Sequence, residues 1–179
     1  MNRIPSLRRT LTALAAGWLL AAALAAPAAA SHPQYAPTPF KIGDVGEDLC
    51  TYFDTEGEAS WPAVHAPQVP SVEISGTAVI SHAPPETICL SVVPFPRHIE
   101  FIGYIRDEPV AEHAVPFKVA DDGGGFPGSG FEYEFSLVAP SGNPIDYVTA
   151  AICKDGIADD SSWEDDCTEA VVIVPGGQG

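Results

Sequence analysis

Basic residues are scarce in this sequence of 179 residues. It has 8 Lys and Arg against 24 Asp and Glu, which gives a formal net charge of −16 at pH 7. A charge of this size repels nucleic acids and anionic membranes, so we expect neither as a partner. It favours cations or basic partners, although an acidic surface that contacts only solvent has the same composition.

Motifs of the common enzyme classes are also lacking. The sequence has no P-loop, no dinucleotide-binding fingerprint, no Cys-x-x-Cys and no Gly-x-Ser-x-Gly elbow. A pair of carboxylates for glycoside hydrolysis cannot be singled out among the 24 acids. The sequence therefore gives no support for catalysis, and a non-catalytic binding or interaction module for a surface, glycan or protein ligand is the leading hypothesis.

Long apolar runs are limited to the N-terminus. Residues 11–26 are apolar, Arg3, Arg8 and Arg9 precede them, and residues 28–30 are alanines. This order is typical of a signal peptide, so cleavage after residue 30 and secretion to the extracellular space are predicted. An uncleaved anchor is the alternative, but the stretch is short for a bilayer span. Cleavage would leave 5 basic and 24 acidic residues, a formal charge of −19.

Cysteine occurs four times, always beyond the predicted signal peptide. An even number in an oxidising compartment indicates two disulfides, for which three pairings are open. Apolar alternation places Cys89 and Cys153 on the sides of their strands that face away from the core, which disfavours an immunoglobulin-type bridge between them. We therefore predict the pairs Cys50–Cys89 and Cys153–Cys167.

Sustained helical periodicity is absent after residue 30, and apolar residues alternate with polar ones instead. Alternation is clearest in residues 131–137, and it is also present in residues 86–93 and 98–106, which are predicted as the two central strands. In residues 86–93, Ile88, Leu90 and Val92 share one face. The pattern predicts an all-β fold, an immunoglobulin-like two-sheet antiparallel sandwich of about seven strands, with a small barrel as the alternative.

The chain is predicted to have four parts. Residues 1–30 are the signal peptide, residues 31–70 a Pro-rich arm or linker with an ambiguous short strand at 49–53, residues 71–175 the sandwich, and residues 176–179 a disordered tail. The other predicted strands cover residues 71–81, with a bulge or kink at Gly76, residues 110–119, with Pro116 at an edge or break, and residues 131–137, 145–153 and 168–174.

An acidic loop between the last two predicted strands is the first candidate site. The predicted Cys153–Cys167 bridge would close this loop and hold several carboxylates close together. Calcium takes six to eight oxygen ligands, although the spacing here does not match an EF-hand. The calcium hypothesis rests on Asp155, Asp159, Asp160, Glu164, Asp165 and Asp166.

Two tryptophans in predicted loops form the second candidate site. Trp61 and Trp163 would stack on sugars or anchor a protein partner if they were exposed. The alternative is that they cover the open ends of the sandwich, which is the commoner role for such residues.

Two alternative functions rest on single residues. His32 stands next to the predicted cleavage point, and if processing fell after Ser31 instead, His32 would be the first residue and would chelate copper through its amino group and ring, as in secreted β-sandwich copper enzymes that begin with His. A second ligand would then come from His65, His82, His98 or His113. An extracellular protease inhibitor would instead present Lys154 beside the loop that follows Cys153.

Overall fold

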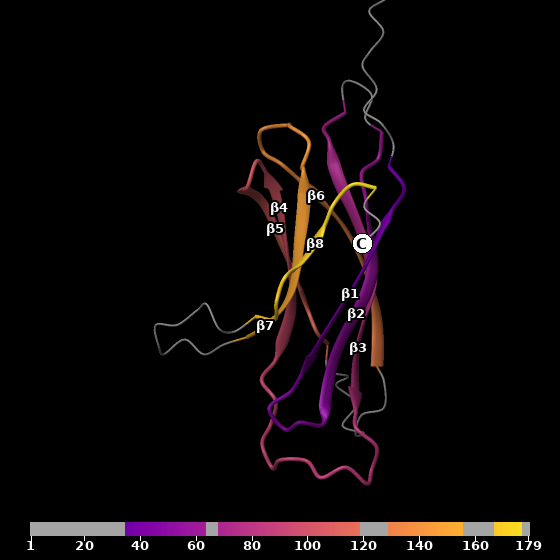
Figure 1. Ribbon diagram of the computed structural model, residues 1–179, viewed down its shortest axis with the longest axis vertical. Coiled ribbons are helices and arrows are strands. Elements are labelled where there is room, and N and C mark those ends of the chain that lie inside the picture. The colour runs from indigo at the N-terminus through magenta and orange to yellow at the C-terminus, as the bar shows by residue number, and fades with distance from the viewer. Residues whose placement is uncertain (1–34, 64–67, 119–128, 156–166, 177–179) are drawn as a thin grey trace, which may run out of the picture.

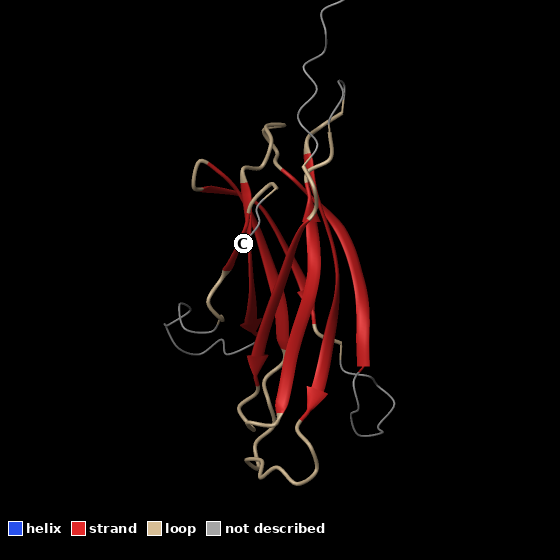
Figure 2. Ribbon diagram, turned by 45° about the vertical axis from the view of Figure 1, so that its right-hand side comes forward, coloured by secondary structure: helices blue, strands red, loops and turns tan. Residues whose placement is uncertain are grey.

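The computed structural model describes residues 35–63, 68–118, 129–155 and 167–176. They form two four-stranded antiparallel sheets that pack as a sandwich (Figure 1, Figure 2). The first sheet has the order β1-β2-β3-β6, with β1 (Thr38–Val45), β2 (Thr51–Ser60), β3 (Ser71–His82) and β6 (Ser129–Val138). The second has the order β5-β4-β7-β8, with β5 (Glu108–Pro116), β4 (Arg97–Ile105), β7 (Tyr147–Lys154) and β8 (Val171–Ile173). The all-β, two-sheet prediction is confirmed.

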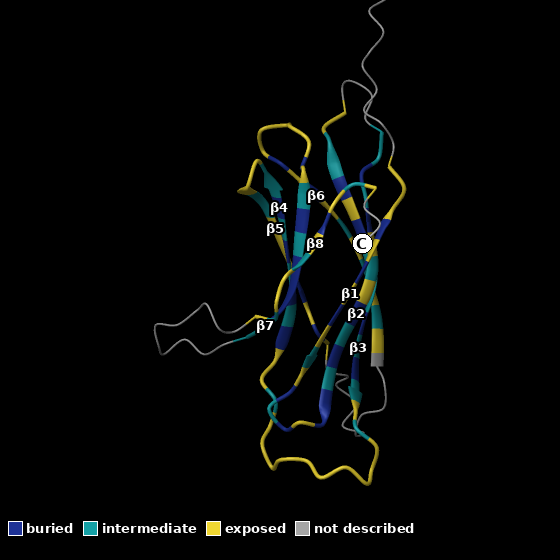
Figure 3. Ribbon diagram, viewed as in Figure 1, coloured by how far each residue is buried: buried dark blue, intermediate teal, exposed yellow. Residues whose placement is uncertain are grey.

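The core lies between the sheets and consists of alternate residues from each strand (Figure 3). Phe101 of β4 lies at its centre, with ring centroids 5.7 Å from Phe40 of β1 and 5.2 Å from Phe135 of β6. The alternation on β3 buries Val72, Ile74, Ala78 and Ile80. Each large apolar side chain buried in this way contributes about 1.5–3 kcal/mol, so the period-two pattern is the main source of stability.

The prediction of a central strand at residues 86–93 is wrong. These residues lie in the loop between β3 and β4, at the lower end of the view in Figure 1, and Figure 3 shows the loop as exposed. Proline has no amide proton and cannot donate to a sheet ladder, so Pro84, Pro85, Pro94 and Pro96 separate the segment from both neighbouring strands. The two places beside β4 are taken by β5 and β7.

The N-terminal strands β1 and β2 lie within residues 31–70, where an arm or linker was predicted. They pair from Thr38↔Ala59 to Val45↔Tyr52 and make up half of the first sheet. The inward side chains of β1 alternate with outward ones in the sequence, but the prolines nearby hide the pattern. Pro39 is tolerated because β1 is an edge strand.

Gly76 does not form the predicted bulge. The register runs unbroken through Gly57↔Gly76↔Tyr133. A Cβ at Gly76 would lie 2.5 Å from the Tyr133 hydroxyl oxygen, so glycine is needed for close packing and not for a turn. Among the described strands, a register shift lies between Gly103 and Tyr104, where β4 pairs with β5.

The remaining strand predictions overlap the observed strands β3 to β8. The weak strand that was expected to mark an edge is β5, which is an edge strand and ends at Pro116. Both predicted disulfides, Cys50–Cys89 and Cys153–Cys167, are confirmed. The predicted signal peptide (residues 1–30) lies outside the described residues, as do residues 177–179 of the predicted tail.

The two ends of the described fold meet across the sheets. The Thr38 hydroxyl on β1 donates a hydrogen bond of 2.8 Å to the carbonyl oxygen of Val174, which follows β8. The described ranges contain no helix with the length and apolar character that a membrane crossing requires.

Candidate binding surface

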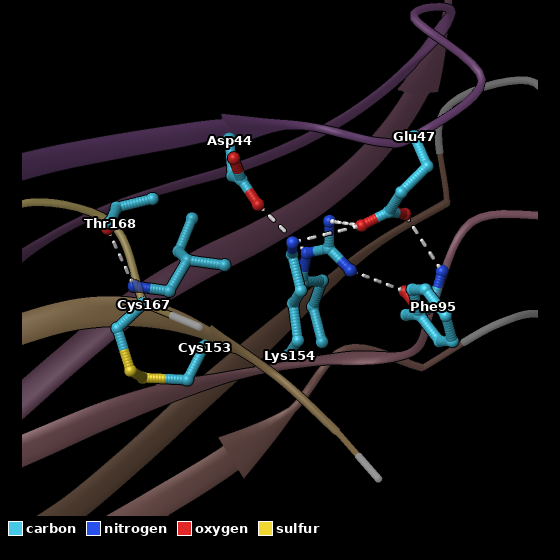
Figure 4. Close-up of polar contacts among 9 residues, drawn as sticks. Asp44, Glu47, Phe95, Cys153, Lys154, Cys167 and Thr168 are labelled. Atoms are coloured by element: carbon cyan, nitrogen blue, oxygen red, sulfur yellow. Dashed lines mark hydrogen bonds and ion pairs between the residues drawn. A yellow bond between two sulfur atoms is a disulfide. The ribbon is translucent and has the colours of Figure 1, made fainter. Parts of the chain in front are cut away.

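A buried arginine links the two sheets at one end of the sandwich (Figure 4). The Arg97 side chain on β4 has no exposed surface. Its Nε donates to Asp44 on β1 at 2.8 Å, its Nη2 to Glu47 in the β1–β2 loop at 2.9 Å, and its Nη1 to the Phe95 carbonyl oxygen at 2.9 Å. Because each donor group has a partner, this network has a structural role and leaves no charge free for a ligand.

The ionisation of Glu47 depends on this network. Burial would raise the pKa of its carboxyl, but hydrogen bonds from the backbone amides of Glu47 and Phe95, together with the Arg97 guanidinium, lower it from 4.5 to about 2. The Lys154 ammonium also lies 3.4 Å from Glu47 Oε1.

A change in stability at low pH follows from this lowered pKa. The contribution of Glu47 is complete above the unfolded value of 4.5 and is lost as the pH falls toward about 2, because the unfolded chain binds the proton first. We expect the free energy of unfolding, measured with urea at pH 6, 4 and 2.5, to fall in this window. Glu47→Gln should be less stable at pH 6 and show a smaller fall, whereas Glu112→Gln on β5 should behave as wild type. An identical fall in Glu47→Gln would contradict this assignment.

The turn beside this network is fixed by Asp48. Its Oδ1 accepts hydrogen bonds from the amides of Cys50 and Thr51 at 3.0 and 2.9 Å, and its Oδ2 accepts one from the Thr51 hydroxyl at 2.7 Å. These bonds hold Leu49 at a φ of 60°, a left-handed conformation that is uncommon for leucine. The turn therefore positions Cys50 for its disulfide with Cys89.

The acidic loop falls mostly outside the described residues. Asp159, Asp160, Glu164, Asp165 and Asp166 are not described, and the calcium hypothesis stays a prediction. Asp155 is described, and its carboxylate contacts Nδ1 of His98. Among the described residues, the one cluster with metal-ligand spacing is Glu100 with Cys153 and Cys167, whose sulfurs form a disulfide and are not available to a metal.

Trp61 is a core residue and not an exposed one. Its side chain is 7% exposed, and its indole N–H donates a hydrogen bond of 3.0 Å to the Ile145 carbonyl oxygen. This placement matches the alternative in which tryptophan covers an end of the sandwich. Trp163 lies outside the described residues.

The histidines of the copper hypothesis are not brought together where the structure describes them. His98 contacts Asp155, the His113 ring stacks on Phe135 with centroids 4.0 Å apart, and His82 lies 3.4 Å from the Thr51 hydroxyl. His32 and His65 lie outside the described residues. Lys154, named for the inhibitor hypothesis, is paired with Glu47.

An open trough of about 1070 Å³ lies on the outer face of the sheet β1-β2-β3-β6. Its floor is the backbone of one row of paired residues, Phe40, Gly57, Gly76 and Tyr133. Two residues of this row are glycines, and the side chains of the other two, Phe40 and Tyr133, point to the core. There the Tyr133 hydroxyl forms a hydrogen bond of 2.7 Å with the Thr55 hydroxyl. The walls are the neighbouring outward side chains: Pro39, Lys41, Glu56, Glu58, Ser75, Thr77, Glu132 and Glu134. These twelve residues form the acidic trough.

The charges of the acidic trough are arranged in two pairs. Glu56 and Glu58 lie on β2, Glu132 and Glu134 lie on β6, and β3 passes between them with small hydroxyl side chains. Strands in a sheet are about 4.8 Å apart, so the two pairs are about 10 Å apart across β3. Four glutamates and Lys41 give a formal charge of −3. The ion pair of Lys41 with Glu56, at 3.7 Å, is exposed on both sides and therefore weak.

This surface suits an extended basic chain better than a small apolar molecule. Pockets for small ligands are concave and mostly apolar, whereas the acidic trough is open and carries five charged side chains. Glu132 and Glu134 lie in the predicted strand at residues 131–137, whose alternation puts them on the side opposite its apolar residues, but Glu56 and Glu58 lie in the segment predicted as an arm or linker. Comparisons of the chain with protein-family models, with curated proteins and with solved structures found no match.

Proposed function

We propose that this protein is a secreted, non-catalytic binding module whose acidic trough holds an extended basic segment of a partner protein. The observation that carries the proposal is the pairing of β3 with both β2 and β6, which sets two glutamate pairs on opposite sides of a strip of Ser75 and Thr77. An extended chain in the polyproline II conformation advances about 3.1 Å per residue with three residues per turn, so basic side chains three residues apart lie on one side, about 9 Å apart, close to the spacing of about 10 Å between the pairs.

Export is supported by the N-terminal sequence and by the two disulfides, which persist in oxidising compartments. An immunoglobulin-like arrangement is supported by the strand order. The order β2-β3-β6 facing β5-β4-β7-β8 corresponds to strands A-B-E facing C′-C-F-G, with β1 added outside the first strand. Rigid scaffolds of this kind commonly serve as binding domains, which fits the proposed role.

Binding of a capped peptide with lysines at every third position tests the proposal by calorimetry. We expect Glu132→Gln with Glu134→Gln to weaken binding about tenfold, because two charge contacts of about 0.5–1 kcal/mol each are lost. Higher salt should weaken wild-type binding in the same direction. The matched control is Glu108→Gln with Glu112→Gln, which removes the same charge from β5 in the opposite sheet. Equal losses in both variants would mean that net charge alone attracts the peptide, and the trough would not be the site.

A further inference from the structure

The loop between β3 and β4 exposes an unusual amount of apolar surface. Ile88 is 93% exposed, Leu90 52%, Val92 49% and Val93 89%. Leu49, which precedes the other half of the Cys50–Cys89 disulfide, is 58% exposed. Residues 86–93 form the apolar segment. A contiguous apolar surface on a strongly acidic protein marks a contact site, because exposure to water is unfavourable and serves no role in the fold.

The backbone of the apolar segment is also largely unpaired. Within residues 88–93, in the described part of the chain, the amide of Leu90 alone donates to a backbone carbonyl, that of Asp48 at 2.9 Å. Amides of successive residues in an extended chain point to opposite sides. When the segment is extended, the amides of Cys89, Ser91 and Val93 therefore point away from Asp48 and are available to a partner on the outer side of the segment.

The sequence of the apolar segment has the alternation of a strand, but the fold gives it no sheet to join. The Cys50–Cys89 disulfide fixes the segment at its middle and reduces the conformational entropy that binding would remove. The prolines on both sides keep the segment from joining the strands of its own domain. An apolar, tethered segment with free backbone donors and the sequence alternation of a strand has the properties required for strand addition.

We propose that the apolar segment docks onto the exposed edge of a β-sheet in a partner protein and becomes an added strand there. Six residues, 88–93, span about 20 Å when extended, which is the length of an ordinary strand. Ile88, Leu90 and Val92 would pack on an apolar surface beside that edge. The residues from 84 to 96 include the acid Glu86 and no Lys or Arg, so the partner edge is neutral or basic.

A membrane and a second copy of the chain fit these observations less well. Unpaired amides cannot enter hydrocarbon without a large penalty, whereas strand pairing would satisfy them. The segment also lacks the Trp, Tyr, Lys and Arg residues that anchor proteins at membrane interfaces. Two copies of the chain would each bring a formal charge of −16 and repel one another.

The test uses the full chain and a labelled, disulfide-closed hairpin peptide with one open edge of alternating valine and threonine and with terminal lysines. Fluorescence anisotropy measures binding, and hydrogen exchange measures protection of the amides of residues 86–93. We expect binding together with slower exchange in this segment. Leu90→Ser should weaken binding at least tenfold, and Val69→Ser, an equally exposed valine outside the segment, should leave it unchanged.

Ser91→Pro separates strand addition from simple apolar contact. It removes one outward backbone donor, keeps every apolar side chain and favours an extended conformation at Leu90. We expect a loss of at least tenfold, with wild-type thermal unfolding as the check that the domain is intact. Full binding by Ser91→Pro, or no binding of the hairpin by wild type, would overturn the proposal. So would sedimentation of wild type with phosphatidylcholine vesicles, or a dimer that Leu90→Ser dissociates.

Discussion

Arg97→Met is expected to lower the free energy of unfolding by about 3–5 kcal/mol, the usual loss when one partner of a buried ion pair is removed. Asp44, Glu47 and the Phe95 carbonyl oxygen would lose their shared donor inside the end of the sandwich. Methionine fills a similar volume, so the loss reports on charge and hydrogen bonding more than on a cavity. Urea unfolding at pH 7, followed by tryptophan fluorescence, measures the change.

Two variants make the result for Arg97 specific. Lys41→Met removes an exposed ion pair and should change the free energy of unfolding by less than about 1 kcal/mol. Arg97→Lys keeps the charge but cannot direct donors to three separate oxygens, so its stability should lie between those of wild type and Arg97→Met. Wild-type stability of Arg97→Met would contradict the view that this network holds the two sheets together.

Removal of the Cys50–Cys89 disulfide by alanine at both positions is expected to cost about 4 kcal/mol. The bridge closes a loop over a separation of 39 residues, and the loss follows from the greater freedom of the unfolded chain. The Cys153–Cys167 bridge spans 14 residues, so its removal should cost about 3 kcal/mol. Urea unfolding of both double variants, compared with wild type, gives the two values.

The difference in the free energy of unfolding between the two disulfide variants is informative, because each variant lacks one bridge and keeps the other. A larger loss for Cys153→Ala with Cys167→Ala would show that native contacts around that bridge, and not loop length, set the order. In the variant without Cys50–Cys89, hydrogen exchange should also become faster in residues 86–93, because the tether at Cys89 is gone.

Local alternation predicted the strands that carry the core, but it could not tell whether a strand has a neighbour. Residues 98–106 and 86–93 have the same period-two pattern, yet one is the central strand β4 and the other an exposed loop. Periodicity reports which face is apolar, whereas pairing depends on where prolines and disulfides place the segment. In β1, Pro39 had the opposite effect and hid a genuine edge strand.

The Cys153–Cys167 disulfide was predictable because alternation decides which side of β7 Cys153 occupies, whereas the same argument for Cys89 assumed a strand at residues 86–93 that the fold does not contain. The acidic trough was not predictable, because it depends on β6 pairing with β3, whose partner residues lie 49 (Ile80↔Ser129) to 67 (Ser71↔Val138) positions apart in the sequence. The Arg97 network was equally hidden, since nothing in the sequence brings Asp44 next to a residue of β4. Both features therefore depend on contacts between strands that are distant in the sequence, and local sequence patterns do not predict such contacts.

The bond between Thr38 and Val174 has a consequence for how quickly the domain assembles. These residues are 136 positions apart, so this particular link between the two sheets cannot form until the last strand has been synthesised and has reached its place. Contacts between distant parts of a chain make folding slow, in the range of milliseconds to seconds for sandwiches. The fold therefore lacks this contact for as long as the chain is being synthesised. Truncation before residue 174 should leave β1 without its hydrogen bond to the Val174 carbonyl oxygen.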